Sequence, residues 1–249
     1  PDISIGPGTS PAGGYLPLSA FGITPISGVT DDSVTNFNVP AFTYAGETYT
    51  RLGVGSNGYL VVGGSTGGAD VAFLNQNLPD PTRPNNVLAP FWTDFNPPAG
   101  GAIRIATLTD GSDTWLVVDY AGVKEFSSAK FDTFEVWIGV NGDAHPGEDI
   151  SYAYGPIQGN GDGGLMTAGA ENRFGNRGAN YYYNGIGTLP SNGTQLRVTG
   201  AAPAPGETHV VTLTAKGVQL GTWTNCAELD ADIIAGTNIA CSAQGEVIK

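Results

Sequence analysis

The loop at residues 141–149 gathers the oxygen-bearing side chains that a hard cation requires. Asp143, Glu148 and Asp149 lie close together in it, and Gly142 and Pro146 free backbone carbonyls in the same stretch. Calcium prefers such oxygen ligands, although the spacing differs from that of an EF-hand loop. The sequence therefore predicts either a calcium site formed by these three carboxylates or a solvated acidic turn.

A single acid, Asp94, lies inside the apolar segment from Pro84 to Pro98, PNNVLAPFWTDFNPP. The prolines exclude a long helix, so a burst of large apolar side chains indicates a core segment that crosses between sheets. A buried carboxylate needs hydrogen-bond partners or a metal. We expect the Asp94 carboxylate to accept hydrogen bonds from nearby backbone N–H groups, with calcium ligation as the alternative.

Three consecutive tyrosines form the third candidate site. In a strand, Tyr181 and Tyr183 share one face and Tyr182 takes the other. With Asn180 and Asn184 beside them, these rings offer a surface for stacking on sugars or for contact with a protein. The alternative is that the rings cover the core at the edge of a sheet.

No catalytic motif is found in the sequence. His145 and His209 are predicted to lie on the surface, and Val54 replaces the first glycine of a Gly-x-Ser-x-Gly motif around Ser56. No pair of acids is marked as a glycosidase pair, and Glu135 alternates with apolar residues, so we expect it to face solvent. The chain is therefore predicted not to be an enzyme, with a glycan hydrolase that uses an unmarked carboxylate pair as the alternative.

Short strands separated by Asn-Gly turns must position these residues. Apolar residues alternate over 134–140 and again over 150–154, and Ser56-Asn57-Gly58 separates two further alternating runs. No window of a dozen residues shows a convincing helical period. The pattern predicts an all-β fold, a β-sandwich of mostly antiparallel strands over residues 1–200.

The C-terminal residues 207–249 follow a linker-like stretch, AAPAPG, and are predicted to form a short Ig-like β extension. They are too few for a sandwich of their own, so we expect them either to pack on the main domain by pairing with residues 2–5 or to be held by a disulfide staple. In an exported protein, Cys226 and Cys241 would form one disulfide that staples this extension. Two reduced thiols are the alternative.

Composition places limits on the partners. The formal net charge of −13 argues against binding nucleic acid or an anionic membrane surface. No apolar run approaches the roughly 18–20 residues that cross a bilayer. A surface rich in Ser, Thr, Asn and Gly is typical of a secreted protein, and we expect any export signal to lie upstream of Pro1.

Several segments, taken in order, resemble a known family. They are FTYAGETYT (42–50), VGSNGYL (54–60), NVLAPFWTD (86–94), FEVWI (134–138) and ISYAYG (150–155). This order resembles the nidogen-like domains of extracellular proteins. It is closer still to non-catalytic regions that follow the protease domain in secreted bacterial subtilisin-like (S8) serine peptidases, where a run like AENRFGN (170–176) also precedes a tyrosine-rich strand.

The resemblance implies an extracellular, non-catalytic accessory module that serves adhesion, substrate targeting or stabilisation of a tethered protease domain. The motifs of the subtilase triad are absent, so protease activity is not carried over to this chain. An extracellular protein or polysaccharide surface is the expected binding partner. A stand-alone adhesin or surface-layer module is the alternative within the binding class.

Overall fold

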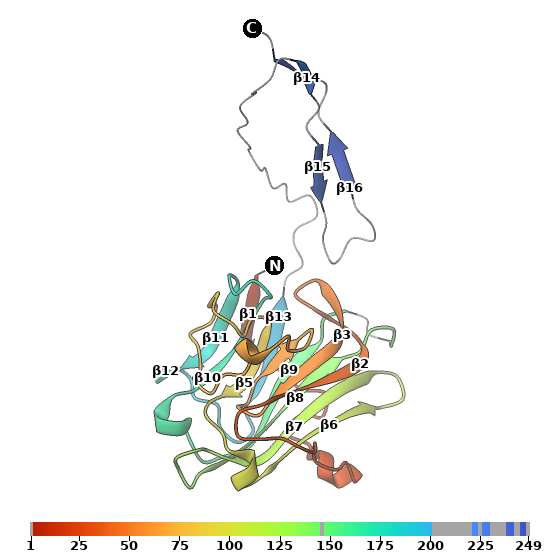
Figure 1. Ribbon diagram of the computed structural model, residues 1–249. Helices are drawn as coiled ribbons and strands as arrows, with labels where there is room; N and C mark the ends of the chain where they lie inside the picture. The colour runs from red at the N-terminus through yellow and green to blue at the C-terminus, as the bar shows by residue number, and fades with distance from the viewer. Residues whose placement is uncertain are drawn as a thin grey trace. The chain divides into compact units, whose positions relative to one another are not determined.

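The computed structural model describes residues 2–144 and 147–200, together with four short strands between residues 221 and 247 (Figure 1). The chain divides into two compact units, Pro1–Pro203 and Ala204–Lys249. In the first unit the described strand pairings are antiparallel, and two sheets enclose the main hydrophobic core. The predicted all-β sandwich is confirmed.

Six strands form the first sheet, in the order β1-β13-β9-β8-β7-β6. Their bounds are β1 Ile3–Pro7, β6 Ala102–Thr109, β7 Thr114–Lys124, β8 Phe131–Gly139, β9 Ile150–Ile157 and β13 Gln195–Gly200. The N-terminal strand β1 thus pairs with β13, a pairing that the sequence did not predict.

Seven strands form the second sheet, in the order β12-β11-β10-β5-β4-β3-β2. Their bounds are β2 Val34–Tyr44, β3 Glu47–Gly55, β4 Leu60–Val62, β5 Val87–Trp92, β10 Thr167–Glu171, β11 Gly178–Tyr183 and β12 Ile186–Gly187. The helical turns of this unit are η1 Leu18–Phe21, η2 Gly68–Asp70, η3 Pro97–Ala99 and η4 Asp162–Gly164. None of the helices in the described residues is long and apolar enough to cross a membrane.

Aromatic rings fill the space between the sheets. Phe134, on β8, stacks on Tyr120 with ring centroids 4.7 Å apart and on Phe91 at 5.6 Å. Phe95 packs on the same ring and, through its backbone, bridges to Glu125 beyond the end of β7. Such ring pairs contribute roughly 0.5–1.5 kcal/mol each beyond burial. The Pro84–Pro98 segment therefore crosses between the sheets, as its composition predicts.

The outer face of the first sheet is covered by residues 8–23, which we call the N-terminal strap. Leu18 of the strap is buried against Val117 and Trp137 of the sheet. The two strap N–H groups of Leu16 and Leu18 donate to carboxylates of the sheet, at 2.9 and 3.1 Å. The strap therefore shields a face that would otherwise meet water.

The strap corrects one prediction about a polar residue. Glu135 accepts the N–H of Leu16 and the indole N–H of Trp137, the latter at 2.7 Å, and it is fully buried. The alternation of β8 indicated a solvated face at Glu135. That expectation was wrong because a Gly/Pro-rich leader, which shows no strand or helix pattern, folds over this face.

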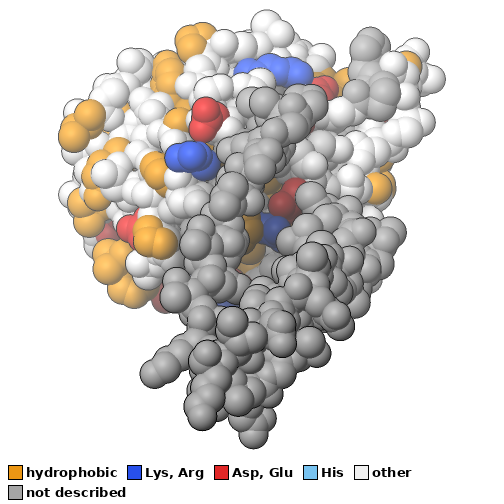
Figure 2. Space-filling view, turned by 90° about the horizontal axis from the view of Figure 1, so that it is seen from above, with side chains coloured by type: hydrophobic (Ala, Val, Ile, Leu, Met, Phe, Trp, Pro, Cys, Tyr) orange, Lys and Arg blue, Asp and Glu red, His pale blue; other side chains and the backbone are white. Residues whose placement is uncertain are grey.

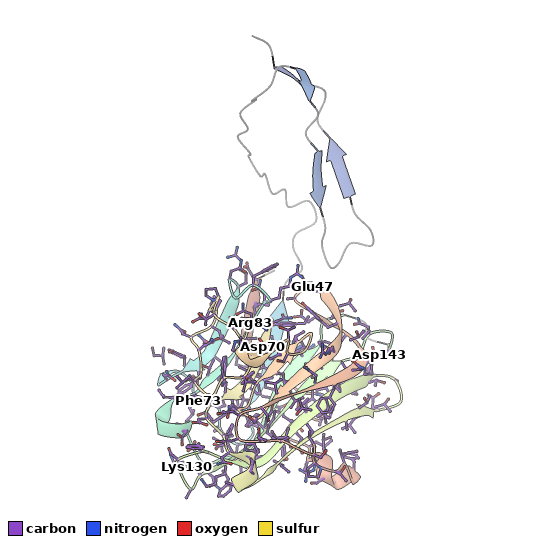
Figure 3. All side chains as sticks on the ribbon, in the orientation of Figure 1. Glu47, Asp70, Phe73, Arg83, Lys130 and Asp143 are labelled. Carbon is purple, nitrogen blue, oxygen red and sulfur yellow. The ribbon has the colours of Figure 1, made fainter. Side chains whose placement is uncertain are left out.

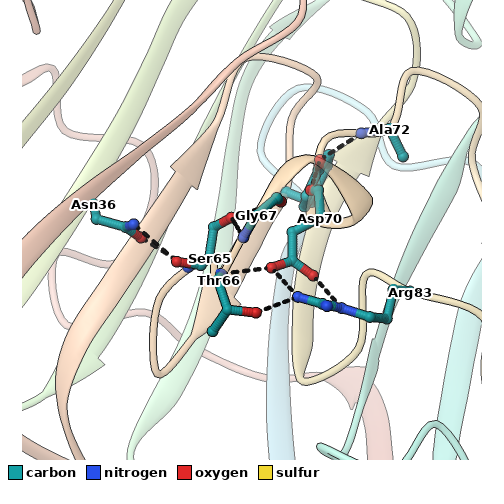
Figure 4. A network of polar contacts seen from close by, with 8 residues as sticks. Asn36, Ser65, Thr66, Gly67, Asp70, Ala72 and Arg83 are labelled. Atoms are coloured by element: carbon teal, nitrogen blue, oxygen red, sulfur yellow. Dashed lines mark hydrogen bonds and ion pairs between the residues drawn. The ribbon is translucent and has the colours of Figure 1, made fainter.

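An ion pair between the exposed Arg83 and the buried Asp70 holds the long loop between β4 and β5 (Figure 4). Arg83 donates to both oxygens of Asp70, from Nε at 2.9 Å and from Nη2 at 2.6 Å, and the N–H of Thr66 donates to the same carboxylate. Burial alone would raise the pKa of Asp70. The hydrogen bonds from Arg83 and Thr66 outweigh this effect, so the pKa lies below its usual value.

The described strands of the second unit form two pairs. Strand β14 (Gly221–Trp223) pairs with β17 (Gly245–Val247), and β15 (Cys226–Leu229) pairs with β16 (Asn238–Cys241). The second pairing places Cys226 opposite Cys241. Residues opposite each other in an antiparallel pair have Cα atoms about 4.5–5.5 Å apart, which is within the range of a disulfide.

The disulfide stays a prediction, as does the packing of the extension on the main domain. We expect protein prepared without reductant to show no thiol reactivity after denaturation, and both cysteines to react once it is reduced. Closing a loop of about 15 residues contributes roughly 3 kcal/mol in the chain-entropy description. Thiol titration in denaturant checks this, with the Cys226→Ser/Cys241→Ser variant as the blank. Two reactive thiols in the untreated protein would contradict it.

Candidate functional site

Two of the segments that carry the family resemblance meet directly in the structure. The side-chain Oδ1 of Asn57 accepts the backbone N–H of Phe95 at 2.8 Å, and the Asn57 carbonyl accepts the N–H of Thr93 at 3.2 Å. The carbonyl of Gly58 accepts the N–H of Phe91. The Ser56-Asn57-Gly58 turn and the Pro84–Pro98 segment therefore form one hydrogen-bonded unit.

Asp94 lies beside this unit but does not make the expected hydrogen bonds. Its side chain is half-buried, and none of the described residues donates a hydrogen bond to its carboxylate. Burial, followed by the negative charges of Asp32, Asp31 and Asp162, raises the pKa of Asp94 to about 6. The expectation of backbone N–H partners was wrong because acids, rather than N–H donors, surround this carboxylate.

Removing the charge of Asp94 should stabilise the fold at alkaline pH. A carboxyl whose pKa is raised on folding contributes stability that is complete below its unfolded value, near 3.8 here, and is lost as pH rises through about 6. We expect Asp94→Asn to melt roughly 1–2 °C higher than the parent at pH 8, a small effect because solvent screens a half-buried charge. At pH 3.5, below the unfolded value near 3.8, the difference should largely vanish. Thermal unfolding with the exposed Asp110→Asn as control checks this, and a lower melting temperature at pH 8 would refute it.

Four acids that are scattered along the sequence form two buried pairs. Asp119 and Glu135 lie opposite each other on β7 and β8. Burial, with the charge of Glu125 adding to it, raises the pKa of Asp132 to about 6, so these two acids form the second pair. All four side chains are at most 1% exposed. Their oxygens accept backbone N–H groups of neighbouring segments, for example that of Gly161 at 3.1 Å from Glu125. These pairs, which the sequence did not mark, fasten loops to the sheet.

Each carboxylate of the 141–149 loop has a partner of its own. The pairs are Asp143 with the N–H of Thr114 (3.0 Å), Glu148 with the N–H of Ala45 (2.6 Å) and Asp149 with the guanidinium of Arg197 (2.6 Å). Figure 3 labels Asp143 at one side of the sandwich. Among the described residues, no group of three His, Cys, Asp or Glu side chains converges as a metal site would require. His145, in the same loop, and His209 lie outside the described residues.

The calcium site stays a prediction with a direct test. Calcium at a hundred times its dissociation constant would stabilise the fold by about 2.7 kcal/mol. A site in this loop therefore requires that the melting temperature rise with added calcium and fall with chelator, and that Asp143→Asn weaken the response. A melting temperature that neither calcium nor chelator changes would show that this loop does not bind calcium.

The three tyrosines are partly or fully buried. Tyr182 is 5% exposed and packs in the main core, whereas Tyr181 and Tyr183 are half-buried. The neighbouring Asn184 holds a loop, since its Oδ1 accepts the N–H of Met166 at 2.9 Å. A ligand-binding role for these rings stays a prediction.

A pocket that the sequence did not predict opens at one end of the seven-stranded sheet. There the β2–β3 turn, the start of β5 and the end of β10 meet, close to the label of Glu47 in Figure 3. It encloses about 20 Å³ and is lined by Ala45, Glu47, Tyr49, Asn86, Asn172, Arg173 and Phe174. The last three belong to the AENRFGN run, which was the only signal of this site in the sequence.

An ion pair and a phenol line the pocket. Nε of Arg173 lies 3.1 Å from Oε1 of Glu47, and the hydroxyl of Tyr49 donates to the other Glu47 oxygen. Burial and the bond to Glu47 raise the pKa of Tyr49, so its hydroxyl stays protonated. The Arg173 guanidinium lies 4.6 Å from the ring centroid of Phe174, a cation–π contact. The ring itself is 58% exposed.

The backbone around the pocket is held in place by tight contacts. Gly175 has φ +59°, and a Cβ there would lie 2.1 Å from the carbonyl oxygen of Asp80, so only glycine fits. The side-chain Oδ1 of Asn172 accepts the N–H of Asn176 at 3.2 Å, and the N–H of Asn86 donates to the Asn172 carbonyl at 3.1 Å. The AENRFGN run therefore presents Arg173 and Phe174 from a fixed turn.

The surface around this end of the sandwich carries few charges. In Figure 2, which views the molecule from above, Lys, Arg, Asp and Glu side chains are scattered singly or in small groups over a mostly uncharged surface, where grey atoms do not cover it. This agrees with a chain in which only 13% of residues are charged. This face therefore exerts little long-range electrostatic attraction on an ionic polymer.

Comparison with known proteins gives one match. A family model described as NIDO related matches residues 9–212. No curated protein and no solved structure matches the chain. The matched range contains both hydrogen-bonded signature segments and every residue that lines the pocket.

Proposed function

The chain belongs to the NIDO-related family, and on this premise we propose that it is a non-catalytic extracellular binding module of a secreted bacterial subtilisin-like protease. The family match supports the nidogen-like part of the resemblance. The subtilisin-like parent is supported by the resemblance of the same segments, and of the AENRFGN run, to regions that follow such protease domains. The module would hold a substrate, matrix or cell surface near the catalytic domain and so raise its effective concentration.

The observation that carries a binding role is the rigid pocket built from the AENRFGN run. An exposed ring and a fixed ion pair are presented from a turn that has little freedom to move. Preorganised groups of this kind lose little entropy on binding, which favours affinity. Most of the buried carboxylates, in contrast, accept backbone N–H groups, a use that supports a structural role for them.

Retention on insoluble extracellular polymers tests the proposal. The chain should co-sediment with at least one of collagen, keratin, chitin and peptidoglycan. Phe174→Ala should lower this retention, whereas Phe21→Ala, which removes an equally exposed ring (52%) from the N-terminal strap, should not. No retention on any of the four polymers would refute targeting to them. Retention together with a parent protein that lacks a protease domain would favour the stand-alone adhesin.

A further inference from the structure

We propose that the pocket beside Phe174 binds a neutral sugar, with one hydroxyl of the sugar in the pocket and the face of its ring against Phe174. The inference rests on the proposed binding function and names the ligand class of that site. Four features of the described residues support it, namely the charge balance, an unsatisfied acceptor, the size of the pocket and the exposed ring.

The charges of the pocket cancel within it. Glu47 and Arg173 are paired at 3.1 Å, and their side chains are only 18% and 28% exposed. A charged ligand would meet one like charge and one opposite charge at nearly the same distance, so it gains little net attraction. A neutral polar ligand loses nothing from this arrangement. The balance therefore favours a neutral ligand over an acidic or basic one.

A buried acceptor in the pocket requires a donor. Asn86 is 6% exposed, and its amide NH₂ donates to the carbonyl of Val62 at 2.8 Å. Its Oδ1 is buried, and no described residue donates a hydrogen bond to it. An unsatisfied buried acceptor costs about 1–3 kcal/mol, so a ligand that donates to Oδ1 recovers this energy. A hydroxyl supplies that donor.

The pocket has the size of a single hydroxyl group. It encloses about 20 Å³. Roughly 10–15 Å³ already holds one water-sized group, and larger groups need several times more space. Only one small polar group of a ligand therefore enters, and the rest of the ligand lies over the rim.

At the rim, Phe174 provides an apolar surface. One part of its ring contacts the Arg173 guanidinium, and 58% of the side chain is exposed. A pyranose carries hydroxyls at its edge and C–H groups on its faces, so it can place a hydroxyl in the pocket and pack a face on the ring. An aromatic ring beside a few fixed polar groups is the usual composition of a site that binds such an amphipathic ligand.

Saturation-transfer NMR with three neutral hexasaccharides, those of cellulose, chitin and mannan, tests the inference, with hexagalacturonate as the anionic probe. At least one neutral probe should show transfer to its ring protons, and hexagalacturonate should show none. Phe174→Ala should weaken the binding roughly tenfold, the loss expected for one stacked ring. Phe174→Trp should retain it, and Phe21→Ala should leave it unchanged.

Each outcome decides between the possibilities. Absence of binding by all three neutral probes, tighter binding of hexagalacturonate, or binding that Phe174→Ala leaves intact would overturn the inference. Retention on collagen or keratin without binding of any oligosaccharide would support the proposed binding function and refute only the inference that the ligand is a sugar. Melting curves of the variants confirm that each one is folded.

Discussion

Alanine in place of Gly58 should lower the free energy of unfolding by roughly 4 kcal/mol or more, enough to leave much of the chain unfolded at 37 °C. Gly58 has φ +76°, a conformation that costs a residue with a Cβ about 1–2 kcal/mol. The larger part of the effect is steric. A Cβ at Gly58 would lie 2.0 Å from the carbonyl oxygen of Phe91 and 3.0 Å from the ring of Phe95.

Neither neighbour can move away from that Cβ. Phe91 belongs to β5, where all six residues are buried, and Phe95 is fixed by the hydrogen bond from its N–H to Asn57. The matched control is Gly193→Ala, because Gly193 also follows an asparagine and has φ +84°, but no atom lies within 4 Å of its Cβ position. That variant should lose only about 1 kcal/mol.

Urea unfolding of the two variants at one pH measures the difference. The excess cost of Gly58→Ala over Gly193→Ala reports the packing of the Ser56-Asn57-Gly58 turn against the Pro84–Pro98 segment, since the backbone term is common to both. Equal losses would show that the two signature segments do not pack as closely as described.

Gly58 also shows which features of the fold can be predicted from the sequence and which cannot. The Asn-Gly pair and the alternating runs around it predict the turn, because positive φ is a local property. The contact with Phe91 depends on which strand lies next to the turn, and sheet order is not encoded locally. The same holds for Asp94, whose acidic neighbours come from segments that are far apart in the chain.

The N-terminal strap explains why Glu135 is buried. Polar residues that alternate with apolar ones normally face water, so the sequence of β8 predicts that Glu135 is exposed. The sequence of the strap shows no strand or helix pattern. Leu18 nevertheless packs on the outer face of the first sheet, and backbone N–H groups of the strap bind the carboxylates there. The AENRFGN pocket was missed for a similar reason, because Glu47, Asn86 and Arg173 converge only through the order of β3, β5 and β10.

Burial of the carboxyls under the strap and the loops has a consequence for pH. Burial raises the pKa of Glu135 to about 8, with the charge of Asp119 adding to it and the bonds from Trp137 and Leu16 opposing it. Burial likewise raises the pKa of Glu171 to about 8. On the acid side, protonation of Asp70 would break its pair with Arg83, because the pKa of Asp70 is lowered on folding.

The sign of the effect follows from these directions. Glu135 and Glu171 bind protons more tightly in the folded state, so their contribution to stability is complete below the pKa of the unfolded chain, near 4.5, and is lost as pH rises through 8. Asp70 contributes above its unfolded value, near 3.8, and its contribution is lost below that. We therefore expect maximal stability between pH 4 and pH 4.5 and a continuous decline from there to pH 9.

The decline should be large for two fully buried groups. Each unit of pKa shift is about 1.4 kcal/mol, so each carboxyl should account for something on the order of 2–4 kcal/mol between pH 5 and pH 9. In a chain of this size the melting temperature should then fall by roughly 8 °C or more over that range. A melting temperature that is flat or that rises from pH 5 to pH 9 would contradict the burial of these acids.

Replacing both Glu135 and Glu171 with glutamine separates their contribution to the pH dependence of stability from that of the other acids. Gln keeps the acceptor that Trp137 and Leu16 use at Glu135 and that the N–H of Asp80 uses at Glu171, but it does not ionise. Glu135→Gln/Glu171→Gln should therefore exceed the parent in stability at pH 9, come closest to it near pH 4 and flatten the profile between them. Asp110→Asn removes a charge from an exposed turn and should leave the slope unchanged. If Asp110→Asn flattens the profile as much as the double variant does, then general charge repulsion in a chain of net charge −13, and not the buried carboxyls, sets the pH dependence.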